Sequence, residues 1–267
     1  MSTTVSDERA RAFLAEGDLE LLGRIPWASN ATLLARVRHR ELEGLAVYKP
    51  VRGERPLWDF PSGTLYRREV AAYLVSEQLG WGLVPPTLVR EGPLGVGSLQ
   101  LYVDADAEVT AFELLADGNA ALPRIAAFDV AINNADRKAG HCLLTRSAHD
   151  QDRWIPKGDQ GGRHGRARTS VGDDQRVWAI DHGVCFHTEP KLRTVLWDLA
   201  GQRLAAADVA DLEALAAAAS GGELGERLAR LLDAEEVAAL AQRSLALARK
   251  GRLPAPRTGR AYPWPLV

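Results

Sequence analysis

The sequence has few cysteines, no long apolar run and almost no net charge. Two cysteines, Cys142 and Cys185, are too few for the disulfide framework of a small secreted protein. No apolar run approaches the roughly 18–20 residues that a membrane span needs, and the N-terminal residues lack the apolar core of a signal peptide. We therefore expect a cytoplasmic protein without an integral membrane segment.

The net charge of the chain bears on whether it binds nucleic acid. A net charge of −2 argues against an extended nucleic-acid-binding surface, so we expect no nucleic acid among the partners. Hydrophobic residues make up 46% and charged residues 25% of the chain, which is ordinary for a globular protein. A length of 267 residues is enough for one large domain or two closely packed lobes.

The first hundred residues show short apolar runs between turn signals, a pattern typical of antiparallel strands. The third run ends in Lys49, and the turn before that run is predicted at Glu43-Gly44. A helix that carries Glu69 beside its apolar face follows. The predicted elements are a helix at 7–16, strands near 19–25, 32–38 and 45–50, a helix at about 65–79, and extended segments at 83–90 and 98–103.

The rest of the chain has mostly helical patterns. Asp233 and Glu236 form a capping-box pattern at the start of the last helix. The proline-rich tail from Pro254 cannot be helical, and its aromatic residues predict that it is pinned against the body. A helix from Leu122 is followed by further predicted helices at 191–199, 209–219, 224–232 and 235–250.

A hydrophilic, glycine-containing segment at 146–176 separates two apolar motifs. It has too little apolar surface to fold alone, so we expect a surface excursion. A loop of this length either recognises a substrate or is a neutral insertion in a tolerant turn.

Each of the two motifs places a carboxylate beside short apolar runs that are typical of buried strands. Asp136 lies in the motif 128–144, and Asp181 lies in the motif 178–186. Packing requires neither acid, and an ionised carboxylate is rarely buried without a partner or a metal. The two aspartates are therefore candidate functional residues.

The first motif has the spacing Asp-Arg-(x)3-polar before a strand, and the second has Asp-x-Gly after a strand. Together they resemble the catalytic and metal-binding loops of the protein-kinase-like superfamily. It is most similar to the phosphatidylinositol 3-/4-kinase-like branch and the actinobacterial SCO1664-type family. The resemblance implies a two-lobed α+β fold with an antiparallel-sheet N-lobe and a mainly helical C-lobe. It divides the chain into an N-terminal helical extension at 1–17, an N-lobe at 18–104 and a C-lobe at 105–267.

The resemblance also implies an activity and roles for individual residues. The protein would bind ATP with Mg²⁺ or Mn²⁺ and transfer phosphate to an unknown acceptor, which is a protein, a small metabolite or a lipid. Asp136 would orient or deprotonate the acceptor hydroxyl, and Lys138 would help to hold the γ-phosphate. Asp181 would bind the metal, with Gly183 allowing a sharp turn. The cation at the α- and β-phosphates would be Lys49.

Three further groups would complete the nucleotide site. Glu69 would pair with Lys49, and the backbone near Tyr102 and Val103 would bond the adenine. The sequence lacks a Gly-x-Gly-x-x-Gly loop, so Ser29 and Asn30 would cover the phosphates.

One position departs from the family pattern. His141 stands where relatives place asparagine as the second metal ligand. Its nitrogen suits Mn²⁺ or Zn²⁺ better than Mg²⁺.

Less specific interpretations stay open. Lys49 could be a lysine that protects a sheet edge, and Glu69 could pair with Arg67 or Arg68 or face water. The departure at His141 also fits a nucleotide-binding pseudokinase with a regulatory role.

A zinc protein is the third hypothesis. The pairs His141-Cys142 and His182-x-x-Cys185 offer four nitrogen or sulfur ligands. Neighbouring residues of a strand point to opposite faces, however, which argues against one shared ion.

Overall fold

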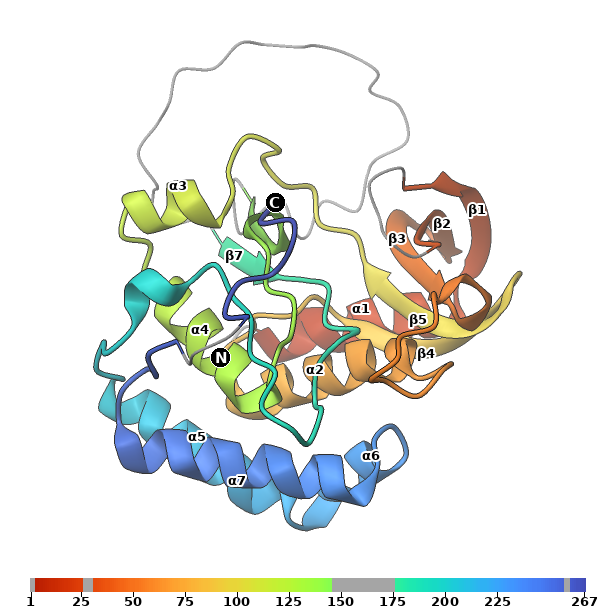
Figure 1. The fold of residues 1–267 in the computed structure, drawn as a ribbon. Helices are drawn as coiled ribbons and strands as arrows, with labels where there is room; N and C mark the ends of the chain where they lie inside the picture. The colour runs from red at the N-terminus through yellow and green to blue at the C-terminus, as the bar shows by residue number, and fades with distance from the viewer. Residues whose placement is uncertain (1–2, 26–30, 146–175, 257–259) are drawn as a thin grey trace.

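The computed structural model describes residues 3–25, 31–145, 176–256 and 260–267, in which an antiparallel sheet is followed by a helical region (Figure 1). The sheet has five strands in the order β1-β2-β3-β5-β4, and every neighbouring pair is antiparallel. The N-terminal elements are α1 (Thr3–Glu16), β1 (Asp18–Arg24), β2 (Leu33–His39), β3 (Leu42–Pro50), α2 (Leu65–Leu79), β4 (Thr87–Gly92) and β5 (Gly95–Leu101).

The turn between β2 and β3 differs from the prediction. The two strands are joined at Arg40 and Glu41, where Arg40 has a φ of 55°. The predicted turn at Glu43-Gly44 is wrong, because both residues pair with β2 inside the sheet. The prediction placed the turn at Gly44 because glycine usually supplies the left-handed conformation, but here Arg40 adopts it.

Strand β3 lies inside the sheet, and its side chains alternate between the two faces. Ala46 and Tyr48 point into a small core that also contains Phe13 and Leu14 of α1. Lys49, the residue after Tyr48, therefore points to the opposite face. Because β3 is not an edge strand, the hypothesis that Lys49 protects a sheet edge is wrong.

The second region is mainly helical, with one short hairpin of strands β6 and β7. The capping box of Asp233 and Glu236 is confirmed at the start of its last helix. Its elements are α3 (Ala111–Ala116), α4 (Leu122–Ile132), β6 (Cys142–Thr145), β7 (Arg176–Ala179), α5 (Ala206–Ala219), α6 (Gly222–Ala229) and α7 (Ala234–Lys250), with 3-10 turns η1 (Val51–Gly53), η2 (Ala139–His141) and η4 (Trp197–Leu199).

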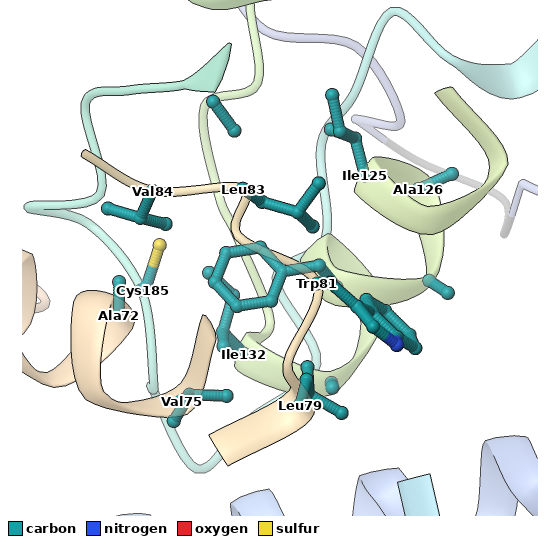
Figure 2. Packing of buried hydrophobic residues seen from close by; sticks show 14 of the residues in the cluster. Ala72, Val75, Leu79, Trp81, Leu83, Val84, Ile125, Ala126, Ile132 and Cys185 are labelled. Carbon is teal, nitrogen blue, oxygen red and sulfur yellow. The ribbon is translucent and has the colours of Figure 1, made fainter. Parts of the chain in front are cut away.

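Helix α2 lies between the sheet and the helical region (Figure 1). Twelve of its 15 residues are buried, although the sequence predicts a single apolar face. Ala72, Val75 and Leu79 lie in the same core as Ile125 and Ile132 of α4 (Figure 2). Both regions therefore fix the position of this helix, and any polar group on it needs a partner.

The predicted helix at 191–199 is wrong except for a final 3-10 turn. Arg193 N donates to Asn134 O at 2.9 Å, and Val195 N donates to Arg137 O at 3.1 Å. These bonds to another loop replace the bonds that a helix would make within itself. The segment instead runs alongside the loop that follows α4.

The C-terminal tail is pinned, as predicted, but through its backbone. Ala139 N donates to Leu266 O at 2.8 Å, and Trp197 Nε1 donates to Ala261 O at 2.7 Å. Trp264 is 89% exposed, so its aromatic ring does not hold the tail.

An antiparallel sheet followed by a mainly helical region confirms the predicted α+β fold class. The domain boundaries near residues 17 and 104 stay a prediction. None of the helices in the described part of the chain combines the length and the apolar character of a transmembrane helix.

Candidate active site

Two asparagines shape the loop after α4. Asn133 ends the helix in the left-handed conformation, with a φ of 54°. The side chain of Asn134 accepts a bond from Asp136 N at 2.9 Å and donates to Asp129 Oδ1 at 2.9 Å. The backbone of Asp136 is therefore held by a buried amide that is itself tied to α4.

A buried ion pair that the sequence motifs do not predict organises this loop. Arg137 and Asp129 are both fully buried, and the guanidinium donates to the two carboxylate oxygens at 2.8 and 2.9 Å. Arg137 also donates to Ile180 O at 2.8 Å, and it lies 2.7 Å from His182 Nε2. One side chain thus joins the two predicted motifs.

The signal for this pair was present in the sequence. Asp129 and Arg137 are charged residues among apolar runs. The rule that singled out Asp136 and Asp181 also requires a partner for this carboxylate and this guanidinium. Eight positions separate them across the end of a helix, and no local spacing rule covers that distance.

Lys49 lies against two carboxylates. Its Nζ contacts Glu69 Oε1, and it donates to Asp181 Oδ1 at 3.0 Å. Glu69 Oε2 accepts from His182 N at 3.0 Å. The strand lysine, the helix glutamate and the loop aspartate therefore meet at one place, as the resemblance implies. Their roles stay a prediction.

An arginine anchors α2 next to Glu69. Arg68 pairs with Glu236 of α7 at 2.7 Å and donates to Cys185 O at 2.7 Å. Because Arg68 is occupied in this way and Glu69 contacts Lys49, the alternative pairing of Glu69 with Arg68 is wrong. The anchored helix presents Glu69 to Lys49 at a fixed position.

Asp181 adopts an uncommon backbone conformation. Its φ is 62°, whereas Gly183 is not among the residues with positive φ. Gly183 lies in a turn, as predicted, but the left-handed residue is Asp181, two positions before it. A non-glycine residue in the left-handed region costs free energy, and such residues gather at functional sites.

The two predicted metal ligands are neighbours. His141 Nε2 lies 3.3 Å from Asp181 Oδ2. The charge of Lys49 holds the pKa of Asp181 well below its usual range. Burial lowers the pKa of His141 to about 4, although Asp181 opposes this effect. At pH 7 the site thus offers a carboxylate and a neutral imidazole, the forms that bind cations.

Asp136 and Lys138 form a second pair on the same loop. Lys138 Nζ lies 3.2 Å from Asp136 Oδ2. Burial raises the pKa of Asp136 to about 6, and the charge of Lys138 limits the increase. A carboxylate with this pKa is ionised at pH 7 and can still accept a proton from a substrate.

Of the remaining predicted nucleotide contacts, the structure describes Tyr102 and Val103. Tyr102 N donates to Leu45 O at 3.1 Å, while the backbone of Val103 makes no hydrogen bond within the described residues. Ser29 and Asn30 lie outside those residues. Ala31 N donates to Gly53 O at 3.0 Å just beyond them.

The structure does not support the zinc hypothesis. Cys142 and Cys185 are free, buried thiols. Burial raises the pKa of Cys142 to about 12 and that of Cys185 well above its usual value. In the described ranges, no three or more His, Cys, Asp and Glu side chains form a group that could hold a metal ion. His141, Cys142, His182 and Cys185 therefore do not make a four-ligand zinc site.

Comparison with known proteins gave the following matches. No protein-family model matches the sequence. The chain is 39% identical to Protein Rv2133c of Mycobacterium tuberculosis over 302 aligned positions, which cover 99% of this chain and 98% of that protein. It is 36% identical to phosphatidylinositol 4-kinase gamma 4 of Oryza sativa subsp. japonica over 104 aligned positions, which cover 33% of this chain and 18% of the rice protein.

Among solved structures, the Golgi casein kinase is similar to this chain. The TM-score is 0.53 with 12% identity, and the match covers 93% of this chain and 75% of the kinase chain. At this identity the similarity shows the fold, which is protein-kinase-like. The match to Protein Rv2133c extends over almost the whole of both chains at an identity that shows common family membership. This chain therefore belongs to the same family as Protein Rv2133c of Mycobacterium tuberculosis.

Proposed function

We propose that this protein is an ATP- and divalent-metal-dependent phosphotransferase of the phosphatidylinositol 3-/4-kinase-like type. The observation that carries the proposal is the contact of Lys49 with both Glu69 and Asp181. A strand, a helix and a loop each contribute one charge to this point, in a chain with a kinase-like fold. Phosphoryl transfer depends on such positioned charges more than on covalent chemistry.

The nucleotide would bind where these charges meet. Lys49 would release Asp181 and bind the α- and β-phosphates, with Glu69 holding its ammonium group in place. No described residue bonds the backbone of Val103, and Tyr102 N already donates to Leu45 O, which favours Val103 over Tyr102 as the partner of the adenine. Ser29 and Asn30 are proposed to cover the phosphates.

Asp181 and His141 are the residues that would hold the metal ion. A carboxylate and an imidazole side by side are a sparse donor set, which suits an ion that takes its other ligands from phosphate and water. The imidazole nitrogen favours Mn²⁺ over Mg²⁺. A bound divalent ion would neutralise charge on the phosphates.

Asp136 would take the proton from the hydroxyl group of the acceptor. The acceptor oxygen then bonds to the γ-phosphorus, the bond from that phosphorus to the β-phosphate oxygen breaks, and ADP leaves. Lys138, whose Nζ lies 3.2 Å from Asp136 Oδ2, would contact the γ-phosphate during the transfer. Its charge also keeps the pKa of Asp136 from rising further.

The acceptor is a protein, a small metabolite or a lipid. The partial match to a rice phosphatidylinositol 4-kinase supports the lipid-kinase-like branch. That match covers 18% of the rice protein, and relatives with one fold differ in substrate, so it does not select among the three acceptors.

His141 supports a second candidate, a nucleotide-binding pseudokinase. It occupies the position of the expected asparagine, and it already contacts Asp181 in the structure. This candidate predicts ATP binding without turnover.

ADP release from ATP tests the proposal and separates the two candidates. We would follow it with Mn²⁺ or Mg²⁺ and with water, phosphatidylinositol vesicles or a protein as acceptor. Asp136→Asn should lower the rate at least about a hundredfold, the usual scale of general-base catalysis. Glu213→Gln, an exposed change on α5, is the matched control. A rate unchanged by Asp136→Asn would overturn the assignment, and ATP binding without ADP release would favour the pseudokinase.

A further inference from the structure

A groove lined by arginines lies on the outer side of α2. It has a volume of about 400 Å³ and is bordered by α1, α2, β4 and the end of α6. This volume is in the range of ligand-binding pockets. Four arginines line it, and none of the other described residues that line it is acidic. They are Arg11, Arg67, Arg227 and Arg230.

The positive charge of this groove is only partly balanced. Arg11 and Arg227 share Glu77, at 3.2 and 3.9 Å, and Arg227 also lies 4.0 Å from Glu223. Arg67 and Arg230 form no ion pair with any carboxylate in the described part of the chain, and both are exposed. Arg67 instead donates through Nε to the hydroxyl group of Tyr66. The groove therefore has two unpaired, solvent-accessible cations on its rim.

The floor of the groove is apolar. Val70 and Leu74 of α2 contribute buried side chains, and Leu88 of β4 adds a half-buried one. A recess of this kind accommodates an apolar side chain, while the rim arginines attract carboxylates. A flat anionic membrane would contact the rim but leave the recess unfilled.

We propose that this arginine groove binds an acidic peptide segment that carries an apolar side chain. Arg67 and Arg230 pair with carboxylates of the segment, and its apolar side chain lies on Val70 and Leu74. The proposal does not rest on phosphotransfer, because the groove lies on α2 away from Glu69 and requires no nucleotide.

Fluorescence anisotropy with a labelled peptide tests the proposal. The probe is a peptide of alternating glutamate and aspartate with a central phenylalanine, measured at low ionic strength without nucleotide. The groove variant is Arg67→Ser with Arg230→Ser. The control variant, Arg203→Ser with Arg249→Ser, removes the same charge from exposed positions elsewhere. Unchanged thermal midpoints establish that both variants fold.

We expect the wild type and the control variant to bind equally and the groove variant to bind at least about tenfold more weakly. Binding should also weaken as salt is added and when serine replaces the phenylalanine of the probe. Equal weakening in the two variants would overturn the proposal, because it would reflect net charge alone. No peptide binding, together with groove-dependent binding to vesicles that contain anionic lipid, would replace the peptide by a membrane surface.

Discussion

Two clusters of opposite charges lie close together in this protein and differ in their access to solvent. The Asp129–Arg137 pair is fully buried on both sides. In the second cluster, the Glu69 side chain is 3% exposed, but those of Lys49 and Asp181 are 20% and 44% exposed. We call the Asp129–Arg137 pair the closed cluster and Lys49, Glu69 and Asp181 the open cluster. The closed cluster joins loops, whereas the open cluster has charges that another molecule can reach.

The hydrogen bonds of the two clusters explain this difference. Arg137 donates to both oxygens of Asp129, to two backbone carbonyls and toward His182, so its guanidinium has protein partners for its donors. Asp181 instead holds a left-handed backbone conformation and faces solvent. We infer that burial with complete pairing marks structural charge, and that partial exposure with backbone strain marks functional charge.

The largest expected effect comes from breaking the closed cluster. Arg137→Ala leaves the carboxylate of Asp129 buried without its partner, which should lower the free energy of unfolding by about 3–5 kcal/mol. Chemical denaturation followed by circular dichroism measures the change. A loss below about 1 kcal/mol would show that the pair does not organise the loop.

In the open cluster, a substitution should affect ATP binding more than it affects stability. Lys49→Met removes the proposed phosphate ligand and should weaken ATP binding at least about tenfold, the scale of one charge-assisted bond. Stability should also fall, because Glu69 is buried and keeps its bond from His182 N but loses its charged partner. The loss should be smaller than in Arg137→Ala, which also removes bonds to two backbone carbonyls. Titration calorimetry with ATP measures the affinity. An unchanged affinity would contradict the role of Lys49.

The contrast between the clusters also shows what the sequence can reveal. Lys49 and Glu69 could be placed because each lies in a regular element whose period indicates its direction. The Asp129–Arg137 pair could not, because it depends on how a loop returns to a helix. The helix predicted at 191–199 failed for a similar reason, since the backbone of Arg193 bonds to the loop at Asn134. The charge-lined groove outside α2 likewise exists only after four elements have packed.

A smaller effect is expected on the pH dependence of turnover. Asp136 must be ionised to accept a proton, and burial raises its pKa to about 6. The rate should therefore fall as the pH decreases through about 6. Lys138→Met removes a charge that lowers this pKa, so the midpoint should move to higher pH. A pH–rate profile with the same midpoint in both proteins would contradict the pairing of Asp136 with Lys138.

The smallest effect is expected from thiol reagents, which should hardly modify Cys142 and Cys185 in the native protein. Burial raises the pKa of Cys142 and of Cys185, so the reactive thiolate is scarce at neutral pH. A thiol reagent should therefore modify the native protein no faster than it unfolds, while both thiols react at once in concentrated guanidinium chloride. Fast modification of the native protein would show that this region is open.

Thermal unfolding with ATP, with and without Mn²⁺ or Mg²⁺, tests the central claim most directly when wild type is compared with Asp181→Ala. At about 100 times the dissociation constant, a bound nucleotide stabilises the protein by roughly 2.7 kcal/mol and raises the midpoint by several degrees. We predict a metal-dependent increase in the wild type that is lost in Asp181→Ala. No increase with any nucleotide would contradict the assignment of this site as a nucleotide-binding site.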